Sequence, residues 1–237
     1  AQATDSASQR RRYWPDVERF FSNLPPHLFR QGVLLKNSLA IAYSETGQFS
    51  DILRRGQDYP LLELHCWLLD DLQMPAGPKR ARLEKRLFLA SLFTFAAGYT
   101  QEAIADDSSN FDHDYTFLAQ ILARQADTQL AHLFPARSSF WLYHRSYWQA
   151  QAEAMITVET AALSAEGAFP PAERMALAKI PVTAVAIATG REALLPQLLG
   201  LVDRLNGVYQ ILRDIAGLRG DLMRRRLTYP ILKIMEA

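Results

Sequence analysis

The chain has 237 residues, a formal net charge of +1, 49% hydrophobic residues and 22% charged residues. This composition is too apolar for a disordered protein, and the small net charge gives no electrostatic basis for binding nucleic acid. The single cysteine, Cys66, excludes a disulfide within the chain and argues against a zinc site built from cysteines.

The sequence indicates no membrane-spanning or secretory segment. Its longest apolar stretch, 87–99, has about 13 residues, fewer than the ~18–20 that a helix needs to cross a bilayer. The first twelve residues are polar, end in the basic cluster Arg10–Arg12 and contain no hydrophobic signal core. We therefore expect a soluble, cytoplasmic protein with a flexible tail over 1–12.

Apolar residues recur three and four positions apart along nearly the whole chain, while the alternation typical of strands is absent. Pro181 is expected to disturb the helix that contains it. No repeat, linker or composition shift divides the chain, so we predict a single all-α domain over 13–237, built as a bundle of about nine helices. The predicted helices cover 15–24, 27–46, 61–74, 79–104, 115–134, 138–164, 170–189 and 192–227, with a short piece from 230.

The first segment with chemical potential is LLELHCWLLDDLQ, residues 61–73. Its apolar residues surround the predicted helix, which favours a central position, and Asp70 and Asp71 follow them. Carboxylates at the end of a buried helix are costly unless they are paired, hydrogen-bonded or bound to a metal such as Mg2+. The alternative is a solvent-exposed helix end.

The second segment is GVYQILRDIAGLRGDLMRRRLTYP, residues 207–230. On a helix Gln210, Asp214, Gly217 and Asp221 share one face, because steps of four, three and four nearly complete whole turns. Asp214 and Asp221 then lie about 10 Å apart along the axis, a separation that suits ligands to different metal ions or to one ion bridged by phosphate. The alternative is a surface helix whose aspartates pair with neighbouring arginines.

Together the two segments resemble the class I isoprenoid synthases: trans-prenyltransferases, squalene and phytoene synthases, and terpene cyclases. WLLDDLQM resembles the first aspartate-rich motif, DDxxD, and QILRDIAGLRGD followed by RRRLTYP resembles the second. In prenyltransferases the second motif reads FQxxDDxxD with a Thr-Tyr-Pro-like segment downstream; Tyr209-Gln210 and 228–230 stand in those places. The string ILRD is also similar to the NIxRDxxED of squalene and phytoene synthases.

The resemblance implies a helical bundle around a central apolar cavity in which the two acidic segments meet. It implies Mg2+ as cofactor, bound by Asp70, Asp71, Asp214 and Asp221. Basic and polar residues near the motifs would hold the substrate diphosphate, although each could equally be a solvated surface side chain. These residues are Arg30, Lys36, Arg80, Lys179, Gln210 and Arg213.

The chain departs from the family pattern at three positions. Met74 stands where the first motif has its third aspartate, and Arg213 and Gly217 replace metal-binding residues of the second. Either Arg213 pairs directly with the diphosphate and replaces part of a metal's charge, or the set of metal ions is reduced or lost.

The chemistry implied by the resemblance is loss of diphosphate from a prenyl chain, assisted by Mg2+ and basic residues. The resulting allylic carbocation needs a dry cavity walled by aromatic faces. The alternative for each aromatic residue is ordinary core packing. The candidates are Trp67, Phe95, Tyr99, Tyr147, Trp148 and Tyr209.

We therefore predict a Mg2+-dependent terpene synthase-like enzyme that ionises a linear prenyl diphosphate and cyclises or rearranges the carbocation. A prenyltransferase of the same fold, elongating or condensing head to head, is the first alternative. A non-catalytic isoprenoid-binding or regulatory subunit is the second. By analogy with the family, a homodimer is left open.

Overall fold

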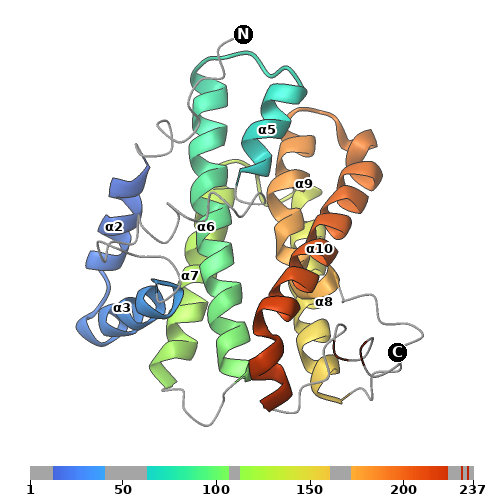
Figure 1. The fold of residues 1–237 in the computed structure, drawn as a ribbon. Coiled ribbons are helices and arrows are strands. Elements are labelled where there is room, and N and C mark those ends of the chain that lie inside the picture. The colour runs from blue at the N-terminus through green and yellow to red at the C-terminus, as the bar shows by residue number, and fades with distance from the viewer. Residues whose placement is uncertain are drawn as a thin grey trace. The chain divides into compact units, whose positions relative to one another are not determined.

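The structure is a computed structural model that describes residues 13–40, 63–106, 113–160 and 172–223, together with Ile231 and Ile234. Every regular element within these ranges is an α-helix or a 3-10 helix, which confirms the all-α prediction (Figure 1). The chain divides into two compact units, residues 1–136 and 137–237. The single domain expected over 13–237 and its isoprenoid synthase type stay predictions.

The first unit is built on a long helix pair. Helices α6 (Pro78–Asp106) and α7 (His113–Ala131) pack along each other, α3 (Pro26–Ala40) packs against α7, and α5 (Leu64–Asp71) against α6. The short helix α2 (Trp14–Ser22) contacts α3. Because α6 carries apolar side chains around most of its circumference between 87 and 97, it forms the core of this unit.

The turn between α5 and α6 fixes the acidic end of α5. Gln73 adopts φ 54, and its N–H donates to the Asp70 carbonyl while the Met74 N–H donates to the Leu69 carbonyl, both at 2.9 Å. This pattern is a Schellman motif, which satisfies carbonyls at a helix C-terminus. Gly77, at φ 151, and Pro78 at the first position of α6 then start the next helix.

The second unit contains α8 (Phe140–Thr160), the 3-10 helix η3 (Ala172–Ala178), α9 (Lys179–Ala188), η4 (Glu192–Leu194) and α10 (Leu195–Met223). Both α8 and α10 pack against η3 and α9. Helix α9 is buried from Ile180 to Ala186, as its nearly uninterrupted apolar sequence requires. The Ser138 hydroxyl accepts a hydrogen bond from the Phe140 N–H at 3.3 Å, at the start of α8.

The prediction that Pro181 disturbs its helix is wrong. Pro181 is the third residue of α9, where its missing N–H costs little because N–H groups of a first helical turn have no intrahelical acceptor. The break falls at Met175 instead, whose φ of −114 and ψ of 26 are not helical.

Several sequence predictions fall outside the described residues: the tail 1–12, the end of the helix over 27–46 and the segment 224–230. Within the described ranges, none of the helices combines the length and the apolar character needed to cross a bilayer.

Candidate functional site

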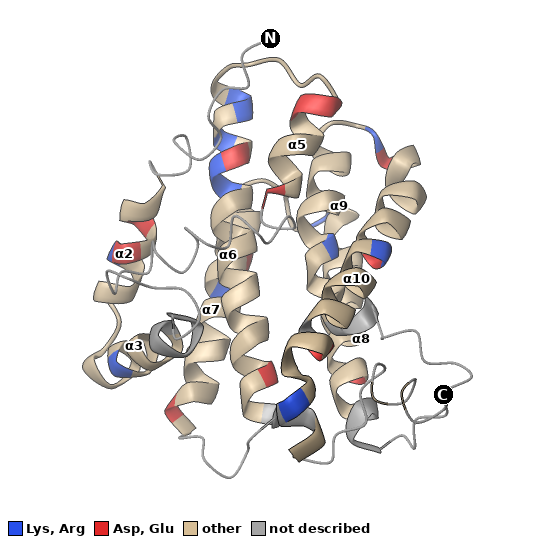
Figure 2. Cartoon of the chain, in the orientation of Figure 1, with Lys and Arg blue, Asp and Glu red and all other residues tan. Residues whose placement is uncertain are grey.

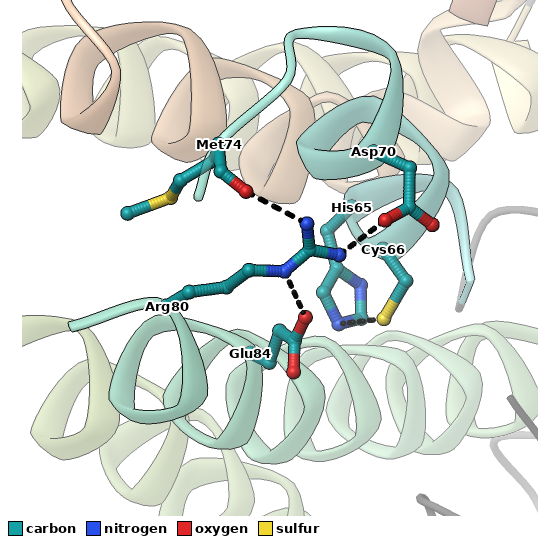
Figure 3. Close-up of polar contacts among 6 residues, drawn as sticks. All are labelled: His65, Cys66, Asp70, Met74, Arg80 and Glu84. Carbon is teal, nitrogen blue, oxygen red and sulfur yellow. Dashed lines mark hydrogen bonds and ion pairs between the residues drawn. The ribbon is translucent and has the colours of Figure 1, made fainter. Parts of the chain in front are cut away.

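In the first unit, one arginine joins the end of α5 to the start of α6. Figure 3 shows Arg80 at the centre of a cluster with Asp70, the Met74 carbonyl and Glu84, called here the Arg80 cluster. Its Nε donates to Glu84 Oε1 at 2.7 Å, Nη1 to the Met74 carbonyl at 2.9 Å, and Nη2 to Asp70 Oδ1. The Schellman turn positions two of these partners, and the four-residue spacing on α6 positions the third.

The Arg80 cluster is charged and partly wet. The side chains of Arg80 and Glu84 are 18% and 13% exposed, whereas that of Asp70 is 70% exposed. Burial alone would lower the pKa of the Arg80 guanidinium, but its hydrogen bonds and ion pairs with Glu84 and Asp70 raise it above its ordinary value. Two carboxylates around one guanidinium leave a net charge of −1, open to solvent on the Asp70 side.

This arrangement bears on two predicted roles. Asp70 and the neighbouring Asp71 are both exposed, so their oxygens are accessible to a hard cation such as Mg2+. Arg80, predicted to hold diphosphate, has its Nε, Nη1 and Nη2 groups engaged within the protein. A phosphate oxygen would have to compete with Asp70 for this guanidinium.

His65, on the same helix as Asp70, is fully buried, and its Nε2 lies 3.3 Å from Cys66 Sγ. His65 therefore belongs to the core of the first unit.

In the second unit, α10 presents a row of polar side chains to its neighbours. Asp203, Asn206, Gln210 and Asp214 are three, four and four residues apart, so they form one line along the helix, called here the α10 polar row. Asn206 is 0% exposed, and Gln210 and Asp214 are also buried. Gln210 Nε2 donates to Asp214 Oδ1 at 2.7 Å, and Asn206 Nδ2 donates to the Met175 carbonyl at 3.1 Å.

Two further pairs bring α8 and α9 to this polar core. Lys179 Nζ lies 2.7 Å from Asp203 Oδ1, and the Tyr147 hydroxyl is hydrogen-bonded to Thr183 Oγ1 at 2.8 Å. Burial raises the pKa of the Tyr147 phenol, the Thr183 hydrogen bond opposes this, and the negative charge of Asp203 adds to the increase. Lys179, predicted to hold diphosphate, is therefore an ion-pair partner in this structure.

Two buried amide oxygens of the α10 polar row have no hydrogen-bond partner in the described part of the chain, Asn206 Oδ1 and Gln210 Oε1. Each amide nitrogen donates to an oxygen acceptor, which fixes the orientation of both amides. A buried carbonyl without a donor is unfavourable, so a bound molecule with N–H, O–H or cationic groups would satisfy these oxygens. This is the feature of the second unit that most suggests a binding site.

The predicted aromatic residues have different surroundings. Trp67 is 47% exposed, and Phe95 and Tyr99 are half-buried with ring centroids 6.3 Å apart. Tyr147 is buried, and half-buried Trp148 donates its indole N–H to His144 Nε2 at 3.2 Å.

The remaining predicted residues lie on helices. Tyr209 is half-buried on α10, and Arg30 is exposed on α3. Lys36, Arg213 and Asp221 are helical, but their side chains fall outside the described set.

Among the described residues, no three His, Cys, Asp or Glu side chains lie close enough to hold a metal ion together. Two carboxylates with waters and substrate oxygens are a common way to bind Mg2+, so Asp70 with Asp71 fits that requirement by donor chemistry. The prediction that the two acidic segments meet in one cavity stays a prediction.

Sequence reasoning missed Asp203, Asn206 and Glu84. The first two continue the spacing of Gln210 and Asp214 toward the N-terminus of α10, and extending that helical line would have found them. Glu84 follows Arg80 by four residues, the spacing of a helical ion pair.

Comparisons of this chain with protein-family models, with curated proteins and with solved structures find no match.

Proposed function

We propose that this chain is a Mg2+-dependent enzyme of the class I isoprenoid synthase type. In this proposal it ionises a linear prenyl diphosphate and cyclises or rearranges the allylic carbocation. The observation that carries the proposal is Asp214, which is 8% exposed and bound to Gln210 on α10. Both residues belong to the segment that resembles the second aspartate-rich motif.

The burial of this pair calls for a reason beyond stability. A carboxylate removed from water loses hydration, and a well-packed apolar residue would serve the core of a helical unit at lower cost. Helix α10 also buries Asn206, and two of its buried amide oxygens have no donor among the described residues. Such a concentration of buried polar groups is typical of a functional site.

Asp70 and Asp71 in the first unit, and Asp214 in the second, are the described residues that would hold Mg2+. The metal would supply positive charge for the oxygens of the departing diphosphate. Asp70 is suited to this role because its carboxylate is mostly exposed and its ion pair with Arg80 is open to water.

The chain's own residues would support the reaction by charge and by exclusion of water. When Asp70 engages a cation, Arg80 loses one partner and can donate to a phosphate oxygen, as guanidinium groups do well. The phenol of the buried Tyr147 is protonated and neutral near neutral pH, as ordinary tyrosines are, and burial raises its pKa further. A neutral phenol fits a site in which a carbocation is formed.

The test is an assay of the full chain with geranyl, farnesyl and geranylgeranyl diphosphates. We expect release of inorganic diphosphate and a cyclic or rearranged hydrocarbon or alcohol by gas chromatography–mass spectrometry, with Mg2+ present and not with EDTA. If a longer prenyl diphosphate formed when isopentenyl diphosphate was added, the reaction would be chain elongation and not cyclisation. A single condensed product would indicate head-to-head coupling.

The second candidate is a non-catalytic isoprenoid-binding or regulatory protein. The Arg80 cluster favours this second candidate, because the Nε, Nη1 and Nη2 groups of Arg80 are engaged within the protein and would have to leave a partner to bind a diphosphate. The same assay separates the two: thermal stabilisation by a non-hydrolysable prenyl diphosphate analogue without release of diphosphate from any substrate would establish binding without catalysis. If neither stabilisation nor release occurred, both candidates would fail.

A further inference from the structure

Helix α10 carries a row of exposed aliphatic side chains in addition to its buried polar row. Leu201, Val208, Ile215 and Leu222 are each seven residues apart, which places them on one line of the helix. The line runs for about 32 Å, at 1.5 Å per residue. Leu212 and Met223 adjoin it, and the six side chains are between 42% and 79% exposed. We call this set the α10 apolar row.

Such a row differs from the scattered apolar residues that any protein surface carries. Single exposed leucines are normal, whereas contiguous apolar surface marks a place of interaction. The other side of α10 packs against η3 and α9, so the helix needs no exposed apolar residues to hold its place in the second unit. We therefore interpret the α10 apolar row as a contact surface for an apolar partner outside the second unit.

The charges beside the row have one sign. Arg204 and Arg219 are exposed and lie three or four residues from members of the row, so they stand among its members on the same face. Among the described side chains of α10, the two acids are otherwise placed: Asp203 pairs with Lys179, and Asp214 is buried. Figure 2 shows α10 mostly tan, with few charged positions along it.

These charges favour an acidic counterpart over a second copy of the chain. Two copies joined row to row would bring arginines together or bury them among leucines, and both arrangements are costly. The row contains no aromatic residue, although aromatic residues are enriched in the cores of protein interfaces. A straight aliphatic line flanked by arginines matches the headgroup boundary of an anionic lipid bilayer.

We propose that the α10 apolar row docks this protein on the surface of anionic membranes. The aliphatic side chains enter the headgroup–acyl boundary, and Arg204 and Arg219 contact lipid phosphates. The inference uses the exposed side of α10 and does not depend on the proposed chemistry, so either can fail alone.

The experiment is sedimentation of the full chain with vesicles of phosphatidylcholine alone and of phosphatidylcholine with a one-third share of phosphatidylglycerol. We expect binding to the anionic vesicles that weakens with added salt. The Leu212→Gln/Ile215→Gln variant should bind at least about tenfold more weakly, because two apolar side chains no longer enter the lipid. The Arg204→Gln/Arg219→Gln variant should lose about thirtyfold, from two lost contacts with the charged surface.

The matched control is Leu142→Gln/Ile156→Gln, which changes two exposed aliphatic residues of α8 and should leave binding unchanged. The proposal would be overturned if the chain bound neither kind of vesicle. It would also be overturned if the control variant lost as much vesicle binding as the Leu212→Gln/Ile215→Gln variant. Light scattering and thermal melting complete the test. A dimer that dissociates in the Leu212→Gln/Ile215→Gln variant would assign the row to a second copy, and a large fall in its melting temperature would assign the row to internal packing.

Discussion

The Arg80 cluster and the α10 polar row use similar residue types in opposite environments. In the Arg80 cluster, Asp70 is mostly exposed, and one guanidinium balances two carboxylates at a helix end. In the α10 polar row, Asp214 is buried within the helix and accepts a hydrogen bond from the neutral amide of Gln210. The exposed carboxylate of the Arg80 cluster can exchange partners with ions from the solvent. The buried carboxylate of the α10 polar row has lost hydration, and its hydrogen bond holds it in one geometry.

This difference predicts different responses to mutation, salt and pH. Buried hydrogen bonds to charged groups are worth more than exposed ion pairs, which water and salt screen. The exposed cluster is accordingly suited to capture a cation, and the buried row to set the shape and polarity of a site. The predictions below test this contrast from the largest expected effect to the smallest.

Gln210→Leu should lower the free energy of unfolding by about 2 kcal/mol, because the buried Asp214 carboxylate loses a charge-assisted hydrogen bond. Urea unfolding followed by circular dichroism measures the change. Val208→Leu, an exposed apolar change on the same helix, is the control and should stay within about 0.5 kcal/mol. Equal stability of wild type and Gln210→Leu would mean that the α10 polar row contributes no more to the free energy of unfolding than exposed surface residues do.

Tyr147→Phe should cost about 1 kcal/mol, because Thr183 Oγ1 loses its buried hydrogen-bond partner. Tyr143→Phe is a matched control on the same helix, since Tyr143 is half-buried and stacks on Tyr147, and its phenol forms no hydrogen bond with the described residues. Thermal unfolding of the two variants side by side gives the comparison. A larger loss in Tyr143→Phe would reverse the assignment.

Asp70→Asn should cost no more than about 1 kcal/mol, since the Asp70 side chain is 70% exposed and its ion pair is screened. The loss should shrink further in high salt. Asp71→Asn, one residue away and also exposed, serves as reference. A loss from Asp70→Asn as large as that from Gln210→Leu would erase the contrast between the two regions.

The smallest effect concerns alkaline pH. Because the pKa of the Tyr147 phenol is raised in the folded state, the native protein keeps this proton after the unfolded chain has released it near pH ~10. The unfolded state then binds fewer protons, so stability is complete below that pH and falls as pH rises above it. Tyr147→Phe should flatten this fall, which melting curves between neutral and alkaline pH would record.

The fold class was predictable because apolar residues recur three and four positions apart along nearly the whole chain. Helix positions followed from prolines, glycines and apolar spacing, and Pro75, Gly77 and Pro78 mark the turn before α6 as expected. Pro181 misled because a proline tolerated in a first turn looks the same in sequence as one that breaks a helix. The position of the actual break, at Met175, has no comparable sequence signal.

The candidate site was predictable residue by residue but not in its pairings. Spacing alone placed Gln210 and Asp214 on one helix face, and the structure brings them to 2.7 Å. Tertiary partners such as Tyr147 with Thr183, or Lys179 with Asp203, join residues 36 and 24 positions apart on different helices. Periodicity within a helix carries no information about such pairs, because they depend on how the helices pack.

The most direct test of the proposed chemistry measures Mg2+-dependent release of diphosphate by the Asp71→Ala and Asp214→Ala variants and by wild type. The control is Glu192→Gln, which changes an exposed acidic residue of η4, just before α10. The account predicts that turnover falls at least about a hundredfold in each aspartate variant and is unchanged in Glu192→Gln. Wild-type turnover in both aspartate variants would contradict it.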